Sequence, residues 1–135
     1  MSIDTVVPDL QVSLRLDPFA PRAARYYVSQ VDRPSPDLRD AVVLLTSELV
    51  SRAVEQSDSA SGESLELLAW MPADVVRVEV RAPRELLDPR EQADWTQYDL
   101  LLLDQVADRW SIDTSEPSGC MWFEIDRRVM APVHA

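Results

Sequence analysis

Glu48 and Arg52 are the two residues whose types and spacing come closest to a chemical site. They lie four positions apart in the stretch from Ser35 to Ser57, and a helix places residues at this spacing on one face. Glu48 is on the N-terminal side, which is the order that favours an ion pair between the two side chains. Taken alone, the two residues therefore predict an ion pair at the edge of a buried helix face.

Other carboxylates and a thiol offer weaker possibilities. Glu48 with Asp99 or Asp104 would form an acid/base pair only if the carboxyl groups lay about 5–10 Å apart. The sequence does not fix that distance, and solvated charges are the simpler interpretation. Cys120 has no neighbouring histidine and stands beside a strand rich in Met and Trp, which indicates a packed thiol rather than a nucleophile.

Two aromatic residues, Trp95 and Tyr98, stand in the polar connection 83–98. Exposed aromatic residues of this kind often anchor protein interfaces. We therefore take both as candidates for binding a partner.

Composition restricts the class of protein and its partners. The 135 residues suit a single domain, and the net charge of −11 would repel phosphate backbones, so nucleic acid is not expected as a partner. One cysteine and one histidine leave no disulfide and no ligands for structural zinc or a histidine-based triad. The two glycines argue against a glycine-rich phosphate loop. Without a leader or an apolar run near ~20 residues, we expect a cytoplasmic protein with no membrane contact.

The stretch from Ser35 to Ser57 is the element that must position Glu48 and Arg52. Ser35 suits a helix N-cap and Pro36 the first helical position, because proline has no N–H to lose there. A second apolar row widens the buried stripe, so we expect this helix to pack against a sheet and other helices. The first apolar row, at helical spacing, is Leu38, Val42, Leu45, Leu49 and Ala53.

The remaining elements are arranged around this helix. We expect residues 1–10 to be a flexible lead-in, 11–126 a single domain and 127–135 a tail. The predicted order is an α+β two-layer sandwich, with helices on one face of a mixed, mostly antiparallel sheet. Its elements are a strand at Gln11–Asp17, a helix from Pro21 to Val31, an antiparallel hairpin of Ser64–Met71 and Asp74–Ala82, a connection with a helical turn near Arg90–Trp95, a helix from Leu100 to Trp110, a turn at Glu116–Gly119 and a closing strand at Met121–Asp126.

The run Ser47–Val54, SELVSRAV, resembles the S-E-L-V-x-N-A-V box of the histidine-kinase-like (GHKL, or Bergerat) ATPase superfamily, in its bacterial anti-sigma-factor serine kinase branch. The resemblance implies that fold, a glutamate that acts as or orients a base, and an asparagine that ligates the magnesium of ATP. Three further runs resemble the P-x-A-A-R-x-F-V, L-V-D-A-L-A-D-R-W and W-F-E motifs of this branch: Pro21–Val28, Leu102–Trp110 and Trp122–Glu124.

The departures from the family pattern fall at the positions that hold nucleotide. Arg52 replaces the magnesium-ligating asparagine, and Ala82 replaces the aspartate that accepts a hydrogen bond from adenine. Gln97 and Asp99 replace the glycines of the phosphate-binding G-x-G, and a carboxylate repels a triphosphate by about 1 kcal/mol per charge pair in water. The lid segment 83–98 has no glycine. We therefore expect no catalytic residue, metal or cofactor, and treat Glu48 and Arg52 as degenerate positions.

The resemblance then implies a bacterial pseudoenzyme that regulates transcription by binding a sigma factor, an anti-anti-sigma factor or a paralogue, or as a homodimer. Trp95 and Tyr98 either anchor that partner or cover the space left by the nucleotide. One alternative is a serine kinase that binds ATP and magnesium at an atypical metal site, with Glu48 as base and Arg52 replacing the charge of the metal. The other is a structural or dimerisation subunit.

Overall fold

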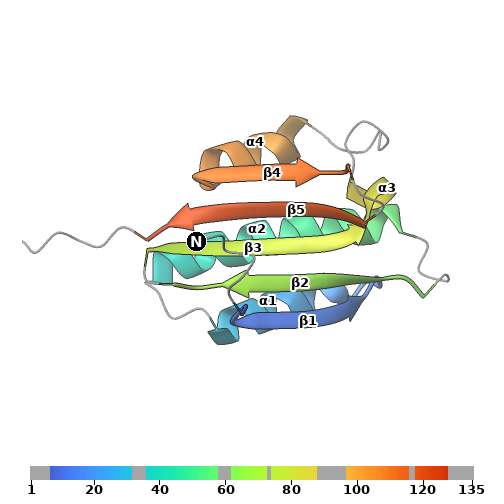
Figure 1. Ribbon diagram of the computed structural model, residues 1–135, viewed down its shortest axis with the longest axis horizontal. Helices are drawn as coiled ribbons and strands as arrows, with labels where there is room; N and C mark the ends of the chain where they lie inside the picture. The colour runs from blue at the N-terminus through green and yellow to red at the C-terminus, as the bar shows by residue number, and fades with distance from the viewer. Residues whose placement is uncertain are drawn as a thin grey trace, which may run out of the picture.

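Five strands form one antiparallel sheet in the computed structural model, which describes residues 7–31, 36–57, 62–72, 74–87, 97–115 and 118–127. The order across the sheet is β1-β2-β3-β5-β4, so the last strand in sequence lies between β3 and β4 (Figure 1). The strands are β1 (Leu10–Arg15), β2 (Ser64–Trp70), β3 (Val75–Pro83), β4 (Arg109–Asp113) and β5 (Ser118–Asp126).

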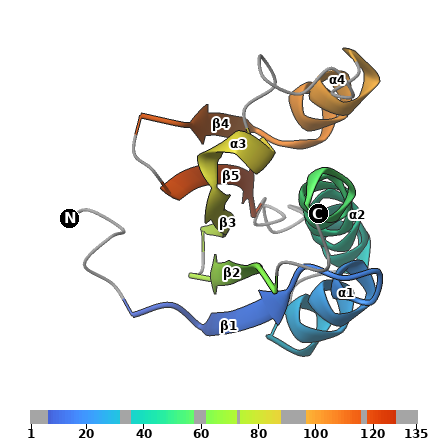
Figure 2. The same cartoon turned by 90° about the vertical axis from the view of Figure 1, so that its right-hand side faces the viewer.

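The two long helices, α1 (Ala20–Val31) and α2 (Pro36–Gln56), lie side by side against one face of this sheet (Figure 2). A short helix, α3 (Arg84–Leu87), follows β3 directly and contacts both α2 and β5. The fourth helix, α4 (Gln97–Val106), leads into β4 and contacts α2. This arrangement confirms the predicted two-layer α+β sandwich.

The core lies between α1, α2 and the sheet, because alternate strand residues and one stripe of each helix point into that layer. Val78 and Phe123 face each other across β3 and β5 and are fully buried, as are Val42 and Leu45 of α2. Each such side chain contributes about 1.5–3 kcal/mol when removed from water. Among the described residues, no helix has both the length and the hydropathy to cross a bilayer.

The central helix and the hairpin are confirmed almost to the residue. The predicted helix at Ser35–Ser57 is α2, and Leu67 of β2 pairs with Val80 of β3 in the predicted antiparallel hairpin. The predicted strand at Gln11–Asp17 is β1, displaced by one or two residues.

The prediction of one helix from Leu100 to Trp110 is wrong at its C-terminal end. Helix α4 ends at Val106, and Arg109 and Trp110 begin strand β4, whose Trp110 pairs with Phe123. The apolar spacing of Leu103 and Trp110 fits a helix, but Trp110 and Ile112 also alternate with polar residues as in a strand. Pairing with β5 decides between these two periods.

The predicted turn at Glu116–Gly119 is also partly wrong, because Ser118 and Gly119 are already the first residues of β5. Gly119 is buried beneath α3, and a Cβ atom there would lie 3.0 Å from the Cα of Arg84 and 3.3 Å from Cδ1 of Leu87. The glycine is therefore needed for the close approach of α3 to the sheet rather than for a turn. The helical turn expected near Arg90–Trp95 lies outside the described residues.

Candidate functional site

Arg52 of α2 is only 8% exposed, whereas the neighbouring Glu48 is half-buried. The Nη1 group of Arg52 donates a hydrogen bond to Oε2 of Glu55 at 3.0 Å, and the Glu55 side chain is 59% exposed. Among the described residues, the partner of this ion pair is thus Glu55 rather than the predicted Glu48. The reason is that the guanidinium reaches from the buried stem of Arg52 to a carboxylate at the surface.

The structure brings together the elements that carry the other predicted positions. Helix α2 contacts β3, whose next-to-last residue is the buried Ala82. It also contacts α4, which begins with Gln97 and includes Asp99. Tyr98 also lies in the first turn of α4. The side chains of Gln97, Tyr98 and Asp99, and the whole of Trp95, lie outside the described residues, so their contacts stay predictions.

Helix α3 is a feature of this region that the sequence interpretation missed. Its Leu86 and Leu87 are buried, at 5% and 0% exposure, and α3 packs on α2 and β5 directly after Ala82. The signal in the sequence is the Leu86-Leu87 pair, which lies in the segment 83–98 that we predict to be a connection. These leucines place aliphatic side chains beside the end of β3.

The remaining candidate residues have local structural roles. Asp104 is exposed and accepts a hydrogen bond from Nε1 of Trp110 at 3.0 Å. Cys120 is partly buried, and its Sγ donates to Oε1 of Glu79 at 3.5 Å. Burial, and secondly the negative charge of Glu79, raises the pKa of the Cys120 thiol to about 11. A thiol with this pKa stays protonated at neutral pH, which agrees with the prediction of a packed thiol.

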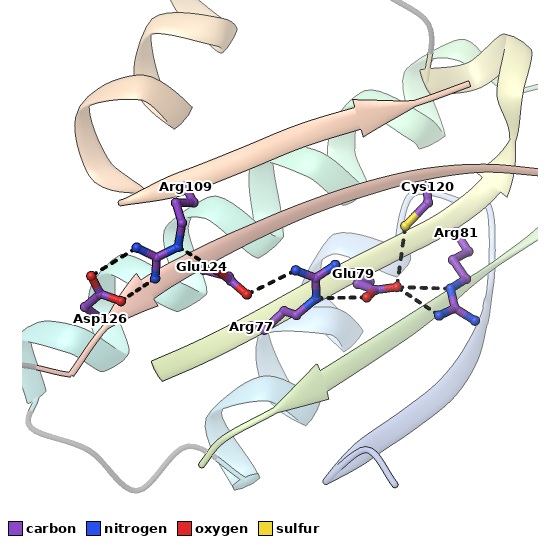
Figure 3. A network of polar contacts seen from close by, with 7 residues as sticks. All are labelled: Arg77, Glu79, Arg81, Arg109, Cys120, Glu124 and Asp126. Atoms are coloured by element: carbon purple, nitrogen blue, oxygen red, sulfur yellow. Dashed lines mark hydrogen bonds and ion pairs between the residues drawn. The ribbon is translucent and has the colours of Figure 1, made fainter. Parts of the chain in front are cut away.

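The sheet face opposite α1 and α2 carries a network of charges centred on Glu79 of β3 (Figure 3). Glu79 is 2% exposed and accepts hydrogen bonds from Nε of Arg77 at 2.9 Å and from Nη2 of Arg81 at 2.9 Å. The Arg77 guanidinium also stacks 4.1 Å from the ring centre of Trp122. Burial raises the pKa of Glu79, but hydrogen bonds and charges from Arg81 and Arg77 outweigh it, and the net pKa is lowered.

The network continues from β3 across the sheet to its β4 edge. Arg77 donates from Nη1 to Oε2 of Glu124 at 3.1 Å, and Arg109 donates from Nε to the other oxygen of Glu124 at 2.7 Å. Arg109 also pairs with Asp126 (Figure 3). Each carboxylate is thus held by at least one guanidinium, and this arrangement can stabilise the sheet but offers no activated base.

A shallow depression of about 600 Å³ lies on the same face, at the end of β2 and β3. Hydroxyl groups and the charged pair Glu66 and Arg81 line it, and Oε1 of Glu66 accepts a hydrogen bond from Nε2 of Gln11 at 3.1 Å. Within the described ranges, no group of three side chains has the composition to hold a metal ion. The lining residues are Ser13, Ser64, Leu65, Glu66, Arg81, Ala82, Pro83 and Ser118.

The comparisons with known proteins bear on the fold. No protein-family model matches the sequence, and no curated protein matches it. Among solved structures, the chain is similar to a crystal structure of the RsbU and RsbW domains of Rv1364c from Mycobacterium tuberculosis, with a TM-score of 0.65 and 17% sequence identity. The similarity covers 90% of this chain and 33% of that one. At this level of identity the match shows the architecture alone, and the chain therefore shares the α+β fold of the matched part of that structure.

Proposed function

We propose that this protein is a non-catalytic regulatory module that binds another protein and has lost the nucleotide site of the anti-sigma-factor kinases it resembles. The observation that carries the proposal is the position of Arg52. The resemblance aligns Arg52 with the asparagine that ligates magnesium, and its guanidinium is 8% exposed and paired with Glu55. An arginine keeps its charge in proteins, so a divalent cation at this point would meet a fixed positive charge.

The end of β3 supports the same proposal. Ala82 stands where the resemblance places the adenine-binding aspartate, and its methyl group cannot accept a hydrogen bond. Directly after it, Leu86 and Leu87 of α3 are buried against α2 and β5. Aliphatic packing there is compatible with a closed region rather than with a nucleotide pocket.

The class of partner follows from the sequence resemblance together with the structural neighbour. The resemblance is to the anti-sigma-factor branch, and the neighbour contains an RsbW domain. A sigma factor, an anti-anti-sigma factor or a paralogue is therefore the proposed partner. Trp95 and Tyr98 remain the proposed anchor residues.

Calorimetric titration with ATP and ADP, with and without magnesium, tests the loss of nucleotide binding. We expect no binding at nucleotide concentrations on the order of 1 mM, because the metal ligand, the adenine acceptor and the glycines of the phosphate loop are all replaced. The variant Arg52→Asn restores only the metal ligand, so we expect it to stay silent as well. Micromolar binding by the unmodified protein would instead favour the kinase alternative.

The protein-binding part is tested by titrating purified sigma and anti-anti-sigma factors of the source organism against the protein. We expect one of them to bind and Trp95→Ala to weaken that binding without a large change in melting temperature. A large fall in melting temperature would assign Trp95 to the core.

A further inference from the structure

Strand β1 is one edge of the sheet, and among the described residues no strand lies on its outer side. Its six residues, LQVSLR, include no proline, and their only charge is Arg15 at the C-terminal end. Edge strands are usually protected from further pairing by proline or by several charges. Figure 2 shows helix α1 against β1 at the same edge of the molecule. The β1 edge is therefore able to accept a further strand.

The backbone groups that face this edge follow from the pairing of β1 with β2. The N–H of Leu16 donates to the carbonyl oxygen of Glu63 at 2.9 Å, in the register that the two strands share. Backbone groups point to alternate sides along an antiparallel strand, so the even-numbered residues of β1 bond to β2. The N–H and carbonyl groups of Gln11 and Ser13 therefore point outward from the sheet.

Opposite charges stand at the two ends of this edge. Asp9 directly precedes β1; its N–H donates to the carbonyl oxygen of Ala69 at 2.8 Å, and its Oδ2 accepts from the N–H of Met71 at 2.6 Å. These two hydrogen bonds fix the carboxylate at the start of the strand. Arg15, at the other end, is exposed, and its guanidinium forms no ion pair with the residues that the structure describes. The edge is thus acidic at one end and basic at the other.

We infer that β1 pairs with β1 of a second copy of the chain, about a two-fold axis at Val12. In this antiparallel register Gln11 of each copy lies opposite Ser13 of the other, so their outward backbone groups bond across the axis. Leu10 lies opposite Leu14 in the same way, and both stay on the side of the sheet that faces the helices. The five-stranded sheets of the two copies then form one continuous sheet.

Charge complementarity selects a second copy as the occupant of this edge. The two-fold register places Asp9 of each copy opposite Arg15 of the other, so that two ion pairs form. An axis at Ser13 would instead place Asp9 opposite Asp17, and the two carboxylates would repel each other. The strand is therefore complementary to itself in one register, as a two-fold interface requires.

The opposite edge of the sheet, β4, does not offer the same free charges. This strand also begins with an arginine and ends with an aspartate, but both side chains are engaged within the chain. Arg109 donates to Glu124 at 2.7 Å and pairs with Asp126. Asp113 accepts from the N–H of Ser115 at 3.0 Å and from its hydroxyl group at 2.7 Å. Pairing β4 with a second copy would compete with these contacts, so β1 is the edge that self-association favours.

Helix α1 adds aromatic side chains at the β1 edge. Nη1 of Arg25 donates to Oγ of Ser47 at 2.9 Å, which marks the side of α1 that faces α2. Tyr27 lies about 200° around the helix from Arg25 and so points away from α2. It is 41% exposed, and its ring centre is 5.6 Å from that of Tyr26. In the two-fold pair the α1 helices of both copies lie on one face of the continuous sheet, where these rings lose contact with water.

Light scattering coupled to size-exclusion chromatography of the full-length protein tests this self-association, which goes beyond the proposed function because it needs no other protein. We expect the mass of a dimer at chain concentrations on the order of 0.1 mM. Asp9→Arg and Arg15→Asp should each weaken the dimer at least about tenfold, because like charges then meet at both ends. An equimolar mixture of these two variants should restore the dimer, since unlike charges meet again at both ends.

Two matched variants control for the change in net charge. Asp40→Arg on α2 and Arg84→Asp on α3 make the same replacements at exposed positions on elements other than β1. Both should keep the dimer without mixing. Melting temperatures of all four variants show whether each one folds. If Asp9→Arg is less stable because it loses the hydrogen bond to Met71, restoration in the mixture still reports on the pairing of charges.

A disulfide at the axis tests the register without changing any charge. The Val12 residues of the two copies lie directly opposite in a pair without mutual hydrogen bonds, with Cα atoms about 4.5 Å apart, which a disulfide can span. In a Cys120→Ala background, Val12→Cys should give a covalent dimer under mild oxidation. Ser13→Cys should not, because Ser13 lies opposite Gln11 rather than opposite itself.

Four outcomes would overturn the inference. They are an unmodified protein that is monomeric at this concentration, a dimer that both charge variants on the β1 edge retain, a mixture that stays monomeric, and a covalent dimer from Ser13→Cys but not from Val12→Cys. A dimer lost equally in the two control variants would also contradict it, because net charge would then be the cause. The nucleotide titration and the effect of Trp95→Ala are independent of these results.

Discussion

Glu79 is a buried carboxylate whose charge is held by two arginines and whose Oε1 also accepts a contact from the Cys120 thiol. Removing one member of a buried ion pair leaves its partners without compensation and costs about 3–5 kcal/mol. We therefore expect Glu79→Gln, which keeps the shape of the side chain, to lower the free energy of unfolding by about 3 kcal/mol. Urea denaturation at neutral pH measures the change.

A matched substitution on the same network is Asp126→Asn, at the exposed end beside Arg109. Exposed ion pairs contribute about 0–1 kcal/mol to stability. The free energy of unfolding of Asp126→Asn should therefore stay close to that of the unmodified protein. Equal losses for the two variants would show that burial does not set the contribution of Glu79.

The same carboxylate predicts a dependence of stability on pH. The pKa of Glu79 is lower in the folded protein than in the unfolded chain, where it is about 4.5. The ionised carboxylate therefore contributes its full stabilising free energy at pH values above the pKa of the unfolded chain. The contribution is lost as the pH falls through the lowered pKa of the folded state. The stability difference between the unmodified protein and Glu79→Gln should therefore shrink below about pH 4. Melting temperatures of both proteins measured down the acid range test this, and a constant difference would contradict it.

Thr46 of α2 presents the reverse case, a polar group without compensation. Its Oγ1 is fully buried and has no hydrogen-bond partner in the part of the chain that the structure describes. Burying an unpaired hydroxyl costs about 1–3 kcal/mol, and valine has nearly the same shape without that group. We expect Thr46→Val to raise the free energy of unfolding by about 1 kcal/mol, as measured by urea denaturation. Thr46→Ser keeps the hydroxyl and loses a methyl group, so it should destabilise the protein; a loss in both variants would reveal an unseen partner of Oγ1.

At the scale of elements, the contact of α3 with β5 depends on Gly119. A Cβ atom at this position would lie 3.0 Å from a backbone atom of α3, closer than packed atoms tolerate, so α3 must move. We expect Gly119→Ala to lower the free energy of unfolding by about 1–3 kcal/mol, as overpacking does. Thermal unfolding measures the loss, and Ser118→Ala, at an exposed position on the same strand, is the neutral control.

The elements that the sequence predicted well are those with one dominant period. Helix α2 has a long apolar stripe and a proline at its first position, and β3 alternates valine with charge over six residues. Strand β4 was missed because its five residues form a strand only through pairing with β5. The local sequence pattern of β4 does not contain this pairing. Helix α3 was missed because one turn has no period to read; its place is set by the glycine beneath it.

At the scale of the whole molecule, the net charge of −11 acts against folding, because like charges are brought together in the compact state. Salt screens exposed charges over about 10 Å at 0.1 M, but it affects the buried pairs around Glu79 far less. We therefore expect the melting temperature to rise by a few degrees between low salt and about 0.5 M sodium chloride. Choline chloride should act in the same way, since the effect is one of ionic strength. A fall in both salts would mean that attraction within the surface network exceeds the net repulsion.

The candidate site was predictable only in part from the sequence. The order of the motifs assigns Glu48 and Arg52 to α2 and Ala82 to β3, and these two elements are in contact. Their proximity follows from the fold, which the sequence predicts. The partner of Arg52 was not predictable, because Glu48 and Glu55 both lie within one turn and burial decides between them. The charge network was hidden as well, since Arg77, Arg109 and Glu124 meet only once the sheet register is known.

The position of β5 between β3 and β4 also has a consequence for synthesis on the ribosome. β5 is the last of the described strands to leave the exit tunnel, yet it occupies an interior place in the sheet. Until it emerges, β3 presents an open edge of nine residues, and β4 has no strand beside it. The nascent chain can close its hairpin and helices early but completes the sheet only at the end. A ribosome that stalls before residue 118 therefore holds a chain with an exposed pairing edge, which chaperones would have to shield.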